Sequence, residues 1–186
     1  MARHREQLNN DDCGLTCIEM IYPITLCRTI HKSTWTIDLA LILYQQGAQI
    51  SVYSINFKAD HQFTPFYILD HDIDKPRVEA NFDLATRIGL TTIKRKTFLH
   101  EVFDQFDYVI VLIDWRKLNC QECGFRLKIL FPFFIGHYIL VNGSQNGDYL
   151  YLDPGKSHSQ CRISKEALEK ARDSSGTDFD MIGIRT

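Results

Sequence analysis

The last third of the chain contains two β-rich runs separated by a turn-rich connection; the runs are residues 137–141 and 149–153, and the connection is residues 142–148. This arrangement predicts an antiparallel hairpin. If the hairpin is symmetric about Gln145, His137 lies directly opposite Asp153, and opposite residues on one face have Cβ atoms about 4.5–5.5 Å apart. A one-residue slip would put the two side chains on opposite faces. The sequence is therefore expected to place a histidine beside a carboxylate on an antiparallel sheet.

A cysteine stands at the start of a predicted helix near the other end of the chain. Residues 13–22 have helical apolar spacing and stop before Pro23, so they predict a buried helix that begins at Cys13. Unpaired backbone N–H groups and the positive end of the dipole at a helix start favour thiolate over thiol. Asp12 is the expected N-cap. The side-chain amide of Gln7, one short loop upstream, is expected to donate to an oxyanion.

These side chains together predict a thiol site. His137 would take the proton of Cys13, and Asp153 would hold the imidazole. The order glutamine, cysteine, histidine, aspartate, with roughly 120 residues between the cysteine and the histidine, is that of papain-like enzymes, whose fold brings distant residues together. The expected activity is hydrolysis of an amide or peptide-like acyl bond through an acyl-enzyme on Cys13. We expect a peptide or protein substrate and no cofactor.

The other segments predict a mixed fold in a single domain, residues 1–186. With 186 residues, of which 45% are hydrophobic, the chain is long enough for one sizeable core. Apolar spacing and capping residues predict further helices at 37–46, from Asp74 to a stop at Gly89, at 98–106, and at 164–172 with Ser164 as N-cap, and strands at 49–55, 108–113 and 181–184. We expect an α+β, papain-like fold with an N-terminal helical part and a C-terminal antiparallel sheet.

Charge and composition argue against several classes of function. The formal net charge is −2 and the lysines and arginines are scattered, so no partner nucleic acid and no membrane surface is expected. The longest apolar run, Ile129–Ile135, is broken by Pro132 and is too short to span a bilayer. The first residues lack the pattern of a signal peptide, so the six cysteines are expected to be free thiols. We expect a soluble cytoplasmic protein, and the sequence leaves its oligomeric state open.

Two motifs have partial metal-site patterns. Cys120 and Cys123 have the spacing of a zinc knuckle, but no second Cys/His pair stands at a zinc-finger distance, so free thiols are the favoured interpretation. Residues 70–74 look like the opening of a calcium loop, yet Lys75 occupies the position that requires glycine and Asn81 that of the final glutamate. We therefore predict no metal site.

Several motifs spread over nearly the whole chain resemble those of the guanylyl cyclase domain-containing protein family, which has plant members. They are Gln7 with Asp12–Cys17, Trp35–Ala40, Val109–Asp114, Gly136–Leu140, Asp153–Pro154 and Glu169–Asp178, the last being the most distinctive. The resemblance implies a papain-like fold related to bacteriocin-processing cysteine peptidases. It implies Cys13 as nucleophile and Gln7 as oxyanion residue. It likewise implies His137 as base and Asp153 as orienting acid.

The name of that family points instead to formation of cyclic GMP from GTP. This is the alternative function, and Mg²⁺ or Mn²⁺ would be needed for it. The sequence contains no Gly-x-x-x-x-Gly-Lys phosphate loop. Residues 35–40, which a cyclase hypothesis would invoke, are also explained as a capped helix with an apolar face. A non-catalytic binding module on the same fold is the third possibility.

Overall fold

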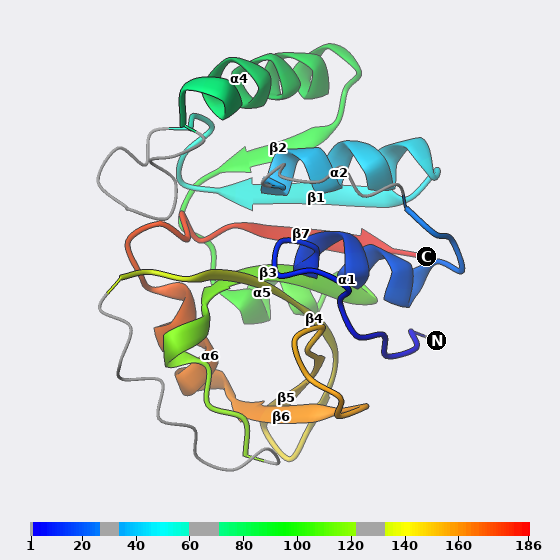
Figure 1. Ribbon diagram of the computed structural model, residues 1–186, viewed down its shortest axis with the longest axis vertical. Coiled ribbons are helices and arrows are strands. Elements are labelled where there is room, and N and C mark those ends of the chain that lie inside the picture. The colour runs from blue at the N-terminus through cyan, green and yellow to red at the C-terminus, as the bar shows by residue number, and fades with distance from the viewer. Residues whose placement is uncertain (1, 27–33, 60–70, 122–132) are drawn as a thin grey trace.

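The computed structural model describes residues 2–26, 34–59, 71–121 and 133–186. Its helices are α1 (Cys13–Ile21), α2 (Thr36–Gln45), α4 (His71–Arg87), α5 (Leu99–Phe103), the short 3₁₀ helix η1 (Trp115–Lys117) and α6 (Lys165–Arg172), and its strands are β1 (Gln49–Ser54), β2 (Thr91–Lys94), β3 (Tyr108–Asp114), β4 (Gly136–Gln145), β5 (Asp148–Leu152), β6 (Cys161–Ser164) and β7 (Met181–Arg185). Figure 1 shows their arrangement.

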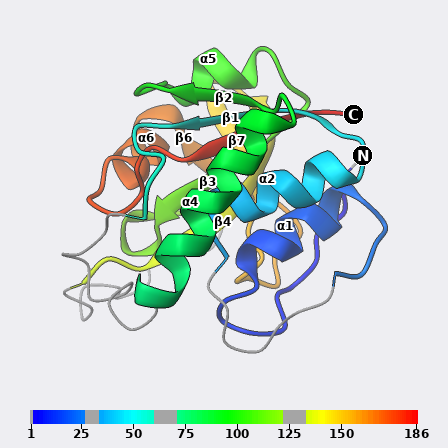
Figure 2. The same cartoon turned by 90° about the horizontal axis from the view of Figure 1, so that it is seen from above.

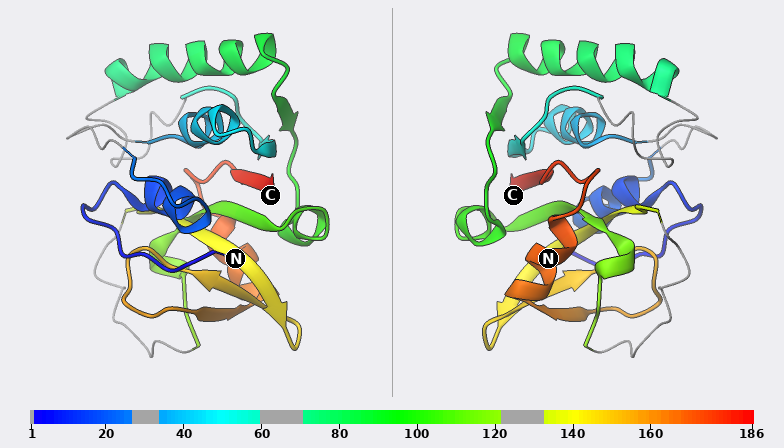
Figure 3. Two further views of the ribbon diagram at one scale, coloured as in Figure 1. Left: turned by 90° about the vertical axis from the view of Figure 1, so that its right-hand side faces the viewer. Right: turned by 90° about the vertical axis from the view of Figure 1, so that its left-hand side faces the viewer.

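The strands of the described residues form one seven-stranded sheet in the order β2-β1-β7-β3-β4-β5-β6. β1 and β2 are parallel and are connected through α4, because parallel neighbours need a crossover. The other neighbouring strands are antiparallel. β7, red in Figure 3, lies between β1 and β3. The expected α+β class is confirmed, but the sheet is not confined to the C-terminal part, since β1 and β2 belong to it.

Helices cover both faces of this sheet. One core contains α1, α2 and α4 with sheet residues such as Ile110 and Leu112. The other contains α5 and α6 with Val109, Val111 and Ile113. Figure 2 shows the two groups of helices on opposite sides of the strands. The continuous apolar run of β3 follows from this arrangement, because a strand that is buried on both faces has no polar side.

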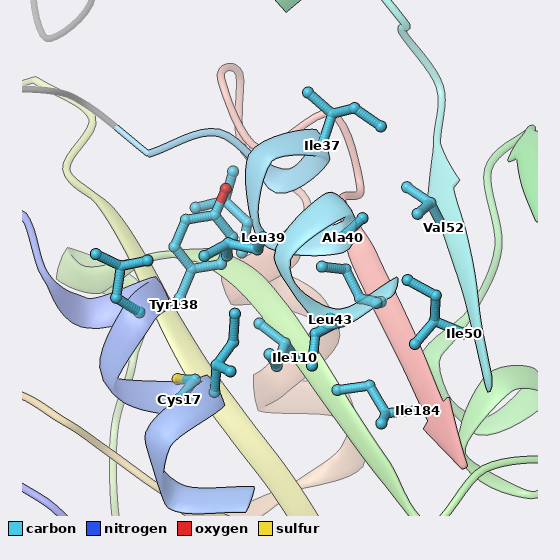
Figure 4. Packing of buried hydrophobic residues seen from close by; sticks show 14 of the residues in the cluster. Cys17, Ile37, Leu39, Ala40, Leu43, Ile50, Val52, Ile110, Tyr138 and Ile184 are labelled. Atoms are coloured by element: carbon cyan, nitrogen blue, oxygen red, sulfur yellow. The ribbon is translucent and has the colours of Figure 1, made fainter. Parts of the chain in front are cut away.

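Helix α1 approaches α2 and β4 closely at Gly14. A Cβ atom on Gly14 would lie 2.7 Å from Leu39 Cδ1 and 3.1 Å from Tyr138 Cδ2. Both neighbours are buried, and Figure 4 shows Tyr138 packed beside Leu39 in this core. Any larger residue at this position would therefore force Leu39 to move. The close approach fixes the start of α1, and with it Cys13, against β4.

The sequence predicted the helices better than their caps. Asp12 occupies the N-cap position of α1, but its side chain makes no capping hydrogen bond and accepts one from Asn9 Nδ2 at 2.8 Å. Asp74 is wrong as a cap, because α4 already begins at His71. Its carboxylate accepts instead from Trp35 Nε1 at 2.9 Å. Ser164 is confirmed as the N-cap of α6, where Oγ accepts from the backbone N–H of Ala167 at 3.1 Å.

The predicted hairpin is present as β4 and β5, with a tighter turn than the sequence suggested. Gln145 pairs with Asp148, so that the loop consists of Asn146 and Gly147 alone. The φ angles of these two residues are 53° and 88°. Positive φ at both positions is typical of a type I′ turn, whose twist matches that of the flanking strands. The strands therefore extend into a segment that was predicted as connection.

The tighter turn changes the register of the hairpin. Leu140 pairs with Leu152, and a bulge follows in β4 after Val141. Continuing the ladder from Leu140 places residue 139 opposite Asp153, so the prediction that His137 lies directly opposite Asp153 is wrong by two positions. A shift of two keeps every side chain on its face, because the side-chain period of a strand is two. His137 and Asp153 thus remain diagonal neighbours on one face.

None of the helices in the described parts of the chain is both long and apolar enough to cross a membrane. Within the same residues, no group of three or more His, Cys, Asp and Glu side chains is arranged to hold a metal ion. Cys120 is a buried thiol without a disulfide, and Cys123 lies outside the described residues.

Candidate functional site

His137 and Asp153 meet at one end of the hairpin. His137 is at the start of β4, and Asp153 directly follows β5. The imidazole Nε2 lies 2.7 Å from Asp153 Oδ1, and both residues are buried. The same carboxylate oxygen also accepts a hydrogen bond from the backbone N–H of Gly155, at 2.9 Å. The predicted histidine–carboxylate contact is therefore confirmed, although the pairing that led to it was wrong.

Cys13 lies at the same place, at the first residue of α1. Its Sγ accepts a hydrogen bond from the backbone N–H of Tyr138, at 3.4 Å. Cys13 is also close enough to the His137 ring to raise the pKa of that imidazole. Because Nε2 of that ring is engaged by Asp153, Nδ1 is the nitrogen left for Cys13. The imidazole thus connects a thiol on a helix to a carboxylate on the sheet.

The charges of this group favour a protonated imidazole. Burial opposes protonation, but the hydrogen bond to Asp153 and then the contact with Cys13 outweigh it and raise the pKa of His137 from 6.5 to about 10. Burial would raise the pKa of Asp153, but the hydrogen bond and charge of His137 hold it below its ordinary value. The pair is accordingly an imidazolium and a carboxylate at neutral pH.

Gln7 is attached to the same end of the hairpin by its backbone. Its N–H donates to the carbonyl of Pro154 at 2.8 Å, next to Asp153. The side-chain Nε2 donates to the carbonyl of Asn9 at 2.9 Å, and Oε1 is buried without a hydrogen-bond partner among the described residues. An amide NH₂ has two donors, so one remains for a further acceptor. The role of Gln7 toward an oxyanion stays a prediction.

Almost the full length of this sequence matches one family of known proteins. The sequence model of the family described as "Guanylylate cyclase" matches residues 2–184. The chain belongs to this family. It is 30% identical over 205 residues to "Guanylyl cyclase 1" of Arabidopsis thaliana, an alignment that covers 97% of this chain and 74% of that protein.

In this member of the guanylylate cyclase family, a turn that was not predicted from the sequence lies beside the His137–Asp153 pair. It runs from Asp153 to Lys156, whose backbone N–H donates to the carbonyl of Asp153 at 3.2 Å. Lys156 is only 7% exposed, and its Nζ lies 3.6 Å from Asp153 Oδ2. The order Asp-Pro-Gly is a turn signature that could have predicted the bend. A buried lysine could not be expected, because lysine is mostly exposed.

A second thiol lies on the same helix but has a different environment. Cys17 is fully buried, and its burial, followed by the charges of Cys13 and Asp153, raises its pKa well above the ordinary value. It is therefore a protonated core residue. Cys17 offers a matched control for Cys13 within α1.

The segment Trp35–Ala40 serves to join helices. Asp38 accepts from the backbone N–H of Trp35 and from Asn81 Nδ2, at 2.9 and 2.7 Å. Arg77 of α4 forms an ion pair with the same carboxylate. These bonds fasten the start of α2 to α4. The structural interpretation of this segment thus accounts for Asp38.

Folding stability should fall as His137 loses its proton. A raised pKa means that the imidazolium stabilises the fold fully below the ordinary value of 6.5, and that this contribution is lost as the pH rises through about 10. Asp153 acts in the opposite direction, since its lowered pKa gives stability that is lost as the pH falls. Urea unfolding of wild type and His137→Gln from mildly acidic to alkaline pH measures this. The gap between the two proteins should shrink toward pH 10; a constant gap would contradict the protonated pair.

Proposed function

We propose that the protein is a thiol-dependent hydrolase with a papain-like arrangement of Cys13, His137 and Asp153. The observation that carries the proposal is the imidazole of His137, which contacts the carboxylate of Asp153 at 2.7 Å and the thiol of Cys13. A nucleophile, a base within hydrogen-bond reach and a group that orients the base are the parts that covalent catalysis by a thiol requires. Helix α1 carries the first part and the β4–β5 hairpin the other two, as in papain-like folds.

The reaction is acyl transfer to the thiol followed by hydrolysis. Cys13 Sγ attacks the carbonyl carbon of an amide, and the N–H groups at the start of α1 with Gln7 stabilise the oxyanion. His137 donates its proton to the leaving amine, which breaks the C–N bond and leaves a thioester on Cys13. Water then attacks the thioester while His137 accepts a proton from it. The C–S bond of the thioester then breaks, which releases the carboxylic acid and returns Cys13 and the protonated His137 to their initial state.

The substrate class that fits this chemistry is a peptide or protein with an accessible amide bond. None of these steps requires a cofactor, because nucleophile, base and oxyanion donors are all protein groups. Asp153 acts by holding the ring through Nε2, so that Nδ1 stays directed at the thiol.

Cyclic GMP formation is the second candidate, because the family description and the Arabidopsis relative carry that name. The reaction needs attack of the ribose 3′ hydroxyl on the α-phosphorus and metal ions to stabilise charge on the phosphates. Asp38 and Asp114, two acids that such ions could use, are already engaged: Asp38 pairs with Arg77, and Asp114 pairs with Arg116 at 2.6 Å. These two acids are therefore already neutralised by arginines and are poorly suited to hold metal ions.

The proposal is tested by reaction with an acyl-type probe that traps nucleophilic cysteines, such as a peptidyl acyloxymethyl ketone. Wild type and the Cys17→Ala control should be labelled, and peptide mapping should locate the label on Cys13. Cys13→Ala should show complete loss of labelling. Absent labelling of wild type would refute the hydrolase and favour a binding module.

The same proteins can be assayed for conversion of GTP with Mn²⁺. We expect slow or absent turnover that does not depend on Cys13, since a thiol contributes nothing to cyclisation. Robust turnover that survives Cys13→Ala but is lost in the double variant Asp38→Asn with Asp114→Asn would reverse the ranking of the two functions.

A further inference from the structure

We propose that Lys156 is a positioning residue of this site, whose buried ammonium group balances the charge of the Asp153 carboxylate that holds the His137 ring. The proposal rests on the proposed function and assigns a role to a residue that lies outside the predicted set of four. Lysine is almost never buried without a charged partner. At 7% exposure, Lys156 is therefore unusual, and its Nζ lies 3.6 Å from Asp153 Oδ2.

The two carboxylate oxygens of Asp153 have separate surroundings. Oδ1 accepts from His137 Nε2 at 2.7 Å and from the N–H of Gly155 at 2.9 Å. Oδ2 is buried and has no hydrogen-bond partner among the described residues, and the ammonium of Lys156 is the charge beside it. A buried carboxylate oxygen costs free energy unless a donor or an opposite charge compensates it. Lys156 supplies that compensation.

The turn that carries Lys156 is built around the pair. Pro154 holds the second position of the turn, where its fixed φ is favourable. A Cβ atom on Gly155 would lie 3.3 Å from both Asp153 Oδ1 and His137 Cε1. A side chain at this position would press on both groups, so glycine suits the close approach of the backbone to the ring. The turn thus covers the pair on one side and brings the lysine to Oδ2 on the other.

The charges that act on Asp153 come from several elements. His137 is on β4 and Lys156 on the turn, and both are cationic. In addition to burial, the charge of Asp153 raises the pKa of Cys17 on α1 and of Tyr151 on β5. His4 contacts only the backbone carbonyl of Asp153, at 3.1 Å.

A second cation, Lys156, balances the charges of the site during the reaction. Once Cys13 is a thiolate, the site holds two anions, the thiolate and the Asp153 carboxylate. The imidazolium of His137 alone would leave one buried negative charge. With Lys156, two cations balance two anions, so the thiolate form can exist in a buried site without a net charge.

Titration of the His137 ring by NMR, without any substrate, tests this role. The variants are Lys156→Met, which removes the charge and keeps the apolar stem, and Lys156→Arg, which keeps the charge. Lys170→Met is the control, since Lys170 is exposed and pairs with Glu166. Spectra of His137→Gln assign the resonance.

In Lys156→Met, both titrations seen by the ring, that of Asp153 and that of His137 itself, should move to higher pH by about one unit or more. The carboxylate loses an opposite charge and the imidazolium loses a like charge, so the shifts have the same sign. Lys156→Arg and the control should titrate as wild type. Unchanged midpoints in Lys156→Met, or equal shifts in Lys156→Arg, would overturn the proposal. Lys156→Gln serves the same test if the methionine variant does not fold.

This outcome is independent of whether the protein hydrolyses amides. Absent labelling of Cys13 by the acyl probe would refute the hydrolase while the titration still reports on Lys156. Normal labelling together with unchanged midpoints would refute the role of Lys156 alone.

Discussion

Replacing His137 by alanine is expected to slow alkylation of Cys13 by iodoacetamide at about pH 6 by about 10²-fold or more. The imidazole close to Cys13 is protonated in the wild type, which stabilises a thiolate beside it. Without it, Cys13 loses the cationic neighbour that favours a reactive sulfur, and the thiolate rather than the thiol is the nucleophile in alkylation. Mass mapping of the labelled peptide gives the rate for each cysteine.

Two comparisons make this result specific. His100→Ala removes an exposed ring that stacks on Phe98, far from the site in sequence, and should leave the rate unchanged. Cys17 should stay unlabelled in every variant that folds, because it is fully buried. If Cys13 resists labelling in wild type, or labels equally fast in His137→Ala, the assignment of the nucleophile fails.

Arg172→Met is expected to destabilise the fold by about 3–5 kcal/mol, the range for breaking a buried ion pair. Arg172 is fully buried in α6 and pairs with Glu169 at 2.7 Å. Its other guanidinium nitrogen donates to the carbonyls of Thr97 and Phe179, at 3.1 and 3.3 Å. Its loss removes the cation beside Glu169 and the donor to two carbonyls, in a place where α6 meets the segments before α5 and β7.

Urea unfolding measures this change. Lys170→Met, on the exposed side of the same helix, should change the free energy of unfolding by less than about 0.5 kcal/mol. Adding Glu169→Gln to Arg172→Met should recover part of the loss, because the unpaired charge is then removed. A loss below about 1 kcal/mol for Arg172→Met would mean that the guanidinium is not needed to join these segments.

The contact between His137 and Asp153 could be predicted because side chains along a β-strand alternate between the two faces of the sheet with a period of two residues. The sequence could not give the register, since the Asn146–Gly147 turn and the bulge after Val141 compensate for one another only partly. The error in register was an even number of residues, so the two side chains were still correctly expected on the same face of the sheet.

Predictions failed where a side chain had a tertiary partner. Asp74 has the chemistry of a helix cap, but Trp35 and Arg77 bind its carboxylate inside α4. β2 and β6 were missed because each is a strand of only four residues. Lys156 was missed because its burial depends on the charge of Asp153 and leaves no pattern in the sequence.

The position of β7 governs the order in which the molecule can form. Residues 181–185 bond to β1 on one side and to β3 on the other, so they fill the middle of the sheet although they are its last strand in sequence. On the ribosome, the β1–β2 part and the β3–β6 part emerge earlier, each with an unpaired edge facing the gap. Such edges are templates for pairing with other chains, and the contacts that close them are long-range and slow to form. The edges of β1 and β3 therefore stay unpaired until β7, the strand between them, has been synthesised.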